Sequence, residues 1–137
     1  MKFKALVLML IFASPLATLA NGEDTVAVLK KRAIYLPLKP SFVVNYGGGG
    51  RLKYLKADVT VRLSSPAAAN AVRHHLPYIR NNLVLLFASQ TDDSINSQEG
   101  KEALRAEALR QVREIIEEED GLDGIVDLYF NRLIVQQ

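Results

Sequence analysis

The clearest alternation of apolar and polar positions lies in residues 54–63. Leu55, Ala57, Val59, Val61 and Leu63 alternate there with Tyr54, Lys56, Asp58, Thr60 and Arg62. This period of two predicts a strand with one buried face. Residues 33–46, just before it, are also rich in apolar side chains, but Pro37 and Pro40 each remove a backbone donor. We therefore predict an edge strand there that is regular mainly over Ser41–Tyr46.

Four consecutive glycines, Gly47 to Gly50, separate these two strands. Glycine adopts positive φ without a steric penalty, so the tetrad predicts a hairpin connection. The functional alternative is a phosphate-binding loop. Such loops lead into the N-terminus of a helix, whereas a strand follows here, and the context therefore favours the plain hairpin.

A first helical pattern begins at Ser64–Pro66, where a serine cap and an early proline suit a helix N-terminus. Its apolar stripe consists of Val72, Leu76, Ile79, Leu83 and Leu86. Pro77 interrupts the stripe, so we expect a kink or a fresh helix start near Leu76. Residues 91–97 are polar and are predicted to form a turn.

A second helix is predicted to begin after a cap at Ser97 and to end at Gly121. The residues expected to face inward are Leu104, Ala108, Val112 and Ile115 or Ile116. Two pairs on its surface, Arg110 with Glu114 and Arg113 with Glu117, have the i,i+4 spacing of helical ion pairs.

The acidic run Glu117 to Asp120 at the end of this helix raises the alternative of a metal site. Neighbouring residues fan around a helix instead of converging on one point. Acids at a helix C-terminus also face the unfavourable end of its dipole. A solvated acidic end is therefore the favoured interpretation.

Residues 125–135 are rich in strand formers. Val126, Leu128 and Phe130 share a face, but Arg132 then falls on it, so we expect a bulge near Asn131 that returns Leu133 or Ile134 to the core. The order strand, strand, helix, helix, strand predicts an α+β domain. Its sheet is small, antiparallel or mixed, with the two helices on one face.

The N-terminus has the pattern of an export signal. Lys2 and Lys4 precede an uncharged apolar run, which ends near the small residues Thr18 and Ala20. This arrangement matches a secretory signal peptide, and we expect cleavage between Ala20 and Asn21.

A retained membrane anchor is the alternative for residues 1–20. It would need about 20 apolar residues, and Pro15 interrupts a run that is already short. Under either interpretation the rest of the chain crosses the inner membrane. We expect residues 21–32 to be a polar tether and residues 33–137 to be one periplasmic domain.

Composition and charge exclude several function classes. The chain has 137 residues with 49% hydrophobic content, enough for one domain with a real core. Outside Lys2 and Lys4, basic and acidic residues are equal in number, 15 each. This balance gives no broad positive field for nucleic acid. The sequence has no cysteine, and so neither a disulfide nor a thiol nucleophile.

Candidate catalytic and metal-binding residues are few. His74 and His75 are adjacent, so on a helix they point about 100° apart and cannot chelate one ion. We expect His74 at the surface and His75 beside the apolar stripe. No nucleophile elbow, P-loop or zinc motif is present. We predict no catalytic, cofactor or metal site, while a hydrolase with carboxylates that meet only in space is the enzyme alternative.

Five segments in order resemble those of the FliL family of flagellar basal-body-associated proteins. They are residues 35–45 (YLPLKPSFVVN), 51–56 (RLKYLK), 77–81 (PYIRN), 97–105 (SQEGKEALR) and 126–136 (VDLYFNRLIVQ). Asn81 stands where the family pattern has an acid, Asn131 where it has threonine, and Leu133 where it has an aromatic residue. The short N-terminus stands in place of the family's cytoplasmic tail and long anchor.

The resemblance implies a periplasmic domain related to the stomatin-like (SPFH) fold. It implies self-association in a ring around the stator units of the flagellar motor, at the inner-membrane surface, supporting torque and swarming. Stator proteins and further copies of the chain are the implied partners, with no cofactor and no catalysis. A soluble periplasmic binding or chaperone-like module outside the motor is the alternative function.

Overall fold

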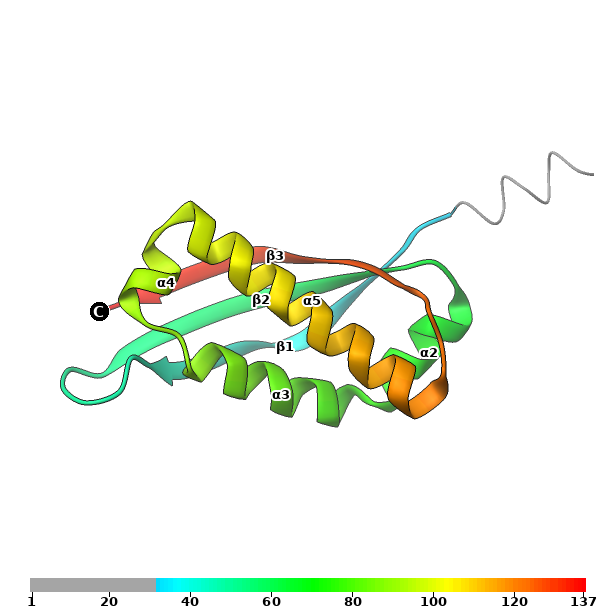
Figure 1. Cartoon of the computed structure of the whole chain (residues 1–137), viewed down its shortest axis with the longest axis horizontal. Coiled ribbons are helices and arrows are strands. Elements are labelled where there is room, and N and C mark those ends of the chain that lie inside the picture. The colour runs from blue at the N-terminus through cyan, green and yellow to red at the C-terminus, as the bar shows by residue number, and fades with distance from the viewer. Residues whose placement is uncertain (1–31) are drawn as a thin grey trace, which may run out of the picture.

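The computed structural model describes residues 32–137, in which three antiparallel strands are covered on one face by helices (Figure 1). The elements in chain order are β1 (Ile34–Tyr46), β2 (Lys53–Leu63), α2 (Pro66–His74), α3 (Leu76–Ala88), α4 (Asp92–Asn96), α5 (Gln98–Asp120) and β3 (Ile125–Gln136). Strand β2 lies in the centre of the sheet. The predicted α+β class is confirmed. The expected export segment with Ala20 and Asn21, and the tether as far as residue 31, lie outside the described residues.

The alternation along β2 produces the buried face that the pattern predicts. All five of its inward residues, Leu55, Ala57, Val59, Val61 and Leu63, are at most 2% exposed. Strand β1 lies at the predicted edge and spans Ile34–Tyr46, but its regular pairing is not confined to Ser41–Tyr46, because Ile34 to Leu38 also pair with β2. Its pairing with β2 shifts between Leu38 and Phe42, and Pro40 lies in that irregular stretch. A proline at an edge and a proline in a bulge are both tolerated, so the strand continues through them.

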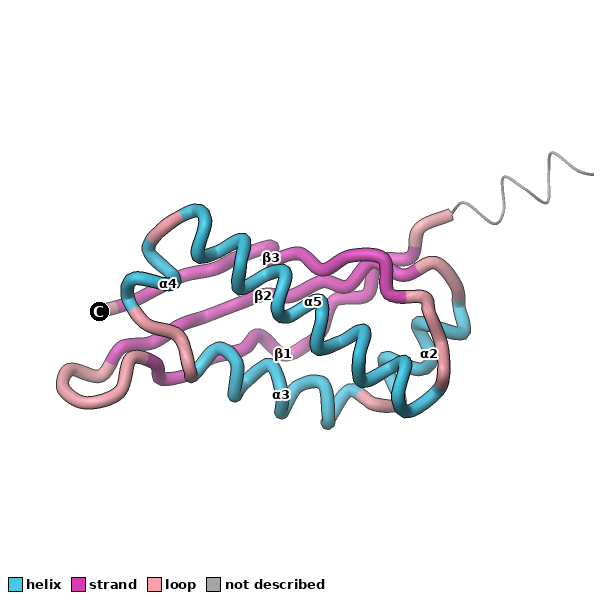
Figure 2. The backbone as a smooth tube through the Cα atoms, in the orientation of Figure 1, coloured by secondary structure: helices cyan, strands magenta, loops and turns pink. Residues whose placement is uncertain are grey.

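The glycine tetrad connects β1 and β2 as a hairpin. All four glycines have positive φ, from 36° at Gly48 to 121° at Gly50. This backbone region is costly for any residue with a side chain. The hairpin loop lies at the end of the sheet opposite to the start of β1 (Figure 2).

The helix boundaries follow the sequence signals closely. Ser65 accepts a hydrogen bond from the backbone of Ala68 and caps α2. The chain breaks between α2 and α3, with Pro77 in the first turn of α3, as predicted near Leu76. Gly121 ends α5 in the left-handed conformation, with φ of 62°.

The prediction of a plain turn at residues 91–97 is wrong, because the short helix α4 lies there. Thr91 and Ser94 form a reciprocal capping box at its start. A capping box usually has glutamate or glutamine at the position of Ser94, so the sequence pattern did not indicate a helix start here. Ile95 is fully buried and fixes α4 against the core.

Strand β3 contains two bulges. The predicted bulge at Asn131 is confirmed, because Asp58 pairs with Arg132 while the next residue, Val59, pairs with Phe130. A second shift leaves Val126 unpaired and 38% exposed. The prediction that Val126 shares the buried face is therefore wrong, and Ile125 is buried instead.

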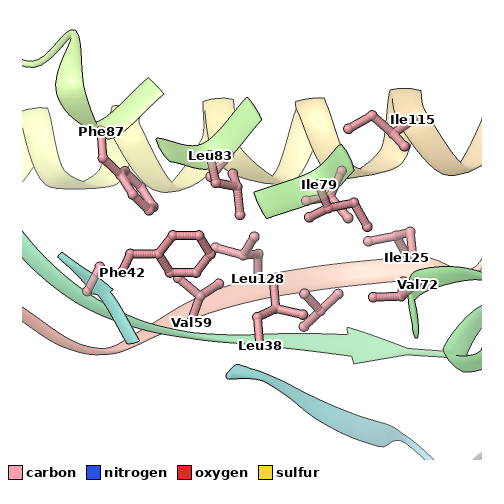
Figure 3. Packing of buried hydrophobic residues seen from close by; sticks show 14 of the residues in the cluster. Leu38, Phe42, Val59, Val72, Ile79, Leu83, Phe87, Ile115, Ile125 and Leu128 are labelled. Atoms are coloured by element: carbon pink, nitrogen blue, oxygen red, sulfur yellow. The ribbon is translucent and has the colours of Figure 1, made fainter. Parts of the chain in front are cut away.

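The core lies between the sheet and the helices α2, α3 and α5 (Figure 3). The ring of Phe87 packs edge-on against Phe42 and Phe130, with ring centroids 5.3 and 5.9 Å apart. The predicted helical stripe omits Phe87 and includes Leu86, which is only partly buried. Leu133 packs against the core, whereas Ile134 is 42% exposed. None of the described helices combines the length and apolar content needed to cross a bilayer.

Candidate interaction surfaces

The free edge of β1 is tied to α3 by one arginine. Arg80 Nη1 donates a hydrogen bond of 2.6 Å to the carbonyl of Pro40, in the irregular part of the strand. The guanidinium carbon also lies 4.1 Å from the ring centroid of Phe42, a cation–π contact. Because Arg80 occupies a backbone acceptor and two prolines lack donors, the middle of this edge offers fewer free groups to another strand.

The free edge of β3 is held in the same way by α5. Arg113 donates to the carbonyls of Ile125 and Val126, at 2.9 and 2.7 Å. Arg105 donates to the carbonyl of Leu128 at 3.1 Å and to the carboxylate of Asp127 at 2.5 Å. The predicted pair of Arg113 with Glu117 is wrong because these carbonyls bind the arginine. The predicted pair of Arg110 with Glu114 is present, at 2.5 Å.

The face of the sheet that carries no helices is called the open sheet face. Its side chains form cross-strand rows on β1, β2 and β3. The rows are Tyr35–Arg62–Asp127, Pro37–Thr60–Tyr129, Val43–Lys56–Ile134 and Asn45–Tyr54–Gln136. Val43 is 63% exposed and Ile134 is 42% exposed, on either side of Lys56. Together with the exposed Tyr35 and Tyr54 on the same face, they make this face a candidate contact surface.

A notch interrupts the open sheet face where the bulges of β1 and β3 flank β2. Its volume is about 420 Å³, and its lining includes Lys39, Ser41, Asp58, Thr60 and Asn131. The Ser41 hydroxyl donates to the Asp58 carboxylate, and Arg132 Nε lies 3.8 Å from the same group. The notch can receive a small polar group of a partner.

On the opposite side of the molecule, α3 and α5 border a groove of about 320 Å³. Its α3 wall includes Tyr78 and Leu85, which are 45% and 62% exposed. Its α5 wall includes Arg110, Glu114 and Glu118. This α3–α5 groove therefore has one apolar wall and one charged wall.

Asp92, at the start of α4, links the helical layer to the base of the hairpin. It forms an ion pair with Lys53 and accepts a hydrogen bond of 3.0 Å from the hydroxyl of Tyr46. These two contacts, with Lys53 the larger cause, lower the pKa of the Asp92 carboxyl. The sequence does not predict this interaction, because Asp92 is distant in sequence from both Tyr46 and Lys53.

The histidines and the acidic run occupy positions close to those expected. His74 is exposed, while His75 is half-buried and its Nε2 lies 3.1 Å from Asp120. Glu117 to Asp120 are all exposed at the end of α5. Among residues 32–137, no three histidine, aspartate or glutamate side chains are placed to bind a metal ion.

Comparison with known proteins identifies the family. A family model described as "Flagellar basal body-associated protein FliL" matches residues 35–136. The chain belongs to this family. FliL proteins are structural flagellar proteins and are not a known enzyme family, and the FliL resemblance predicted from five segments is confirmed.

Two curated FliL proteins show the extent of the similarity. The "Flagellar protein FliL" of Aquifex aeolicus is 26% identical over 103 residues, covering 75% of this chain and 62% of that protein. The protein of the same name from Escherichia coli K12 is 36% identical over 67 residues, covering 49% of this chain and 42% of that protein. The matches thus span about half the length of these FliL relatives.

The motifs that resemble FliL proteins have structural roles in this chain. Arg80, in the PYIRN segment, holds β1, and Arg105, in the SQEGKEALR segment, holds β3. In the same segment Ser97 caps α5 through the backbone N–H of Gly100. A Cβ atom at Gly100 would lie 1.7 Å from the carbonyl oxygen of Ser94, so only glycine fits. These motif residues maintain the fold, which leaves the open sheet face and the α3–α5 groove as candidate contact surfaces.

Proposed function

We propose that this FliL-family chain is a periplasmic accessory protein of the flagellar motor that self-associates around the stator units and supports their torque. Membership of a flagellar basal-body family supports a motor role. The observation that most supports a contact function is the pair of exposed apolar surfaces on opposite sides of one small domain. Surfaces of this kind are typical of proteins that act by binding other proteins.

The proposal includes export and a location at the inner-membrane surface. The pattern of residues 1–20 supports it, with two lysines, an apolar run and small exit residues. We expect the mature chain to begin at Asn21, after cleavage behind Ala20. N-terminal sequencing of the protein recovered from the periplasm and from the membrane tests this. A membrane-bound product that retains Lys2 would contradict cleavage and favour an anchor.

Motility of a deletion strain is the decisive experiment. We expect normal or mildly reduced spreading in soft agar and a larger loss of swarming on hard agar, where the motor works under load. The full chain supplied in trans should restore both phenotypes, and a tagged stator protein should retain it during purification. Normal swarming of the deletion strain would instead favour a soluble periplasmic binding or chaperone-like module outside the motor.

A further inference from the structure

The exposed large apolar side chains of the described residues gather mainly on two opposite faces. Tyr35, Val43, Tyr54 and Ile134 lie on the open sheet face, while Tyr78, Val84 and Leu85 lie on α3. The sheet separates the two groups, because the helices cover only its other side (Figure 3). A monomer gains nothing from exposing apolar groups on both faces, so each face is a candidate for burial in an assembly.

The two faces carry opposite charge. The open sheet face carries the cations Lys56, Arg62 and Arg132 and the acids Asp58 and Asp127. Asp58 lies 3.8 Å from Arg132, and Asp127 is paired with Arg105 of α5, so the remaining cations leave the face with a small positive excess. The second half of α5 is acidic, with six acids between Glu107 and Asp120 against two arginines. The C-terminal end of the helix dipole adds further negative potential there.

Pairing of strands across the sheet edges is the less suitable mode of assembly. Arg80, Arg105 and Arg113 each occupy backbone carbonyls of an edge strand. Two prolines interrupt the donors of β1 as well. Part of each edge is therefore occupied by an arginine or interrupted by proline, as in proteins that disfavour strand addition.

We propose that the open sheet face of one copy docks on the α3–α5 groove and the acidic half of α5 of a second copy. This inference rests on the proposed self-association and names its surfaces. Lys56 then meets Glu118, and Val43 and Ile134, on either side of Lys56, meet Tyr78 and Leu85. An anionic lipid surface fits the groove poorly, because its α5 wall is acidic.

The geometry makes the contact head-to-tail. The two surfaces lie on opposite sides of the domain, so each copy can bind one neighbour on either side, and the series closes into a ring or extends as a filament. Three strands of about 11 residues present roughly 500 Å² per copy. This is less than the ~800 Å² per partner of standard stable complexes, so the contact is weak until copies are held close together.

Charge reversal on each face provides the test. Lys56→Glu and Glu118→Lys both change exposed residues, so each variant is expected to melt like the wild type. Self-association of the full chain in mild detergent is measured by sedimentation velocity over a wide concentration range. Each variant alone is expected to weaken self-association about tenfold, because like charges then face each other.

Recombining the reversed charges distinguishes this interface from others. An equimolar mixture of Lys56→Glu and Glu118→Lys chains, and the double variant, should both recover association to within about threefold of the wild type. Arg51→Glu at the hairpin and Glu99→Lys at the other end of α5 are the matched controls and should have no effect.

Three outcomes would overturn the proposal. If Lys56→Glu weakens association and Glu118→Lys does not, the open sheet face binds another sheet face or a different partner. If neither variant weakens an association that the wild type shows, the copies meet elsewhere and only this interface is wrong. A wild-type chain that stays monomeric at every concentration, and when tethered to liposomes, overturns this interface together with the proposed ring.

Discussion

The two sides of β2 are built from alternate residues of one strand and behave differently. On the inner side Leu55, Ala57 and Val61 are completely buried under the helices. On the outer side Tyr54 is 40% exposed and Lys56 is exposed as well. The inner side specifies the fold, because every change there alters the packing. The residues of the outer side do not pack in the core and can contact a partner, so they bear on function.

The largest expected effect comes from a carboxylate on the inner side. Val59→Asp places a charge at a position that is 2% exposed, without an ionic partner, at a cost of several kcal/mol. We expect the domain to unfold. Lys56→Asp on the outer side should change the free energy of unfolding by no more than ~0.5 kcal/mol. Circular dichroism melts of both variants test the comparison, and equal melting temperatures would show that the register is wrong.

A second comparison contrasts the two sides of α3. Phe87 is fully buried between two other phenylalanines, whereas Leu85 is 62% exposed. Phe87→Ala should destabilise by about 3–5 kcal/mol through lost burial and a cavity. Leu85→Ala should cost less than ~0.5 kcal/mol. Urea unfolding of the two variants measures both changes in the free energy of unfolding. A large loss of stability in Leu85→Ala would mean that the apolar wall of the groove supports the fold.

These contrasts also explain which parts of the fold the sequence could predict. The alternation in β2 and the caps at Ser65, Ser97 and Gly121 are local signals, and all were predicted correctly. The bulge at Asn131 was predictable because Arg132 would otherwise have been buried. Without the second bulge, the apolar Val126 would take the inner position and no polar residue would be buried, so nothing in the pattern indicated this bulge.

The contact surfaces could not be predicted from the sequence, because they depend on tertiary contacts. The α3–α5 groove depends on the packing of two helices separated by α4, and the ties from Arg80 and Arg113 depend on tertiary contacts. Spacing along the chain predicted Glu117 as the partner of Arg113, yet backbone carbonyls of β3 lie closer. Local pairing rules describe an isolated helix and omit such competitors.

A smaller effect is expected at the junction of α4 and α5. Gly100→Ala should improve helix propensity by ~1 kcal/mol, but its Cβ would lie 1.7 Å from Ser94 O. The backbone must move, so we expect a net loss of about 1–3 kcal/mol. Glu99→Ala, in the same turn and exposed, is the matched control. A stabilised Gly100→Ala variant would show that α4 shifts at no cost and does not support α5.

The smallest expected effect concerns pH and the link between α4 and the hairpin. The Lys53 ammonium and the Tyr46 hydroxyl lower the pKa of the Asp92 carboxyl in the folded state. The unfolded chain has the ordinary aspartate pKa of about 3.9. A lowered folded pKa means that the stabilisation is fully present above the unfolded value and is lost as pH falls through the folded one.

Asp92→Asn should therefore be less stable than the wild type at pH 7, and the difference should shrink as the pH falls below about 4. Asp93→Asn is the matched control, since Asp93 lies in the same first turn of α4 and is exposed. Subtracting its effect removes the interaction of any carboxylate with the helix N-terminus, which both residues share. The measurement is urea unfolding of the three proteins between pH 7 and pH 2.5. A difference between Asp92→Asn and the wild type that stays constant over this range would mean that the Asp92 contacts do not depend on its charge.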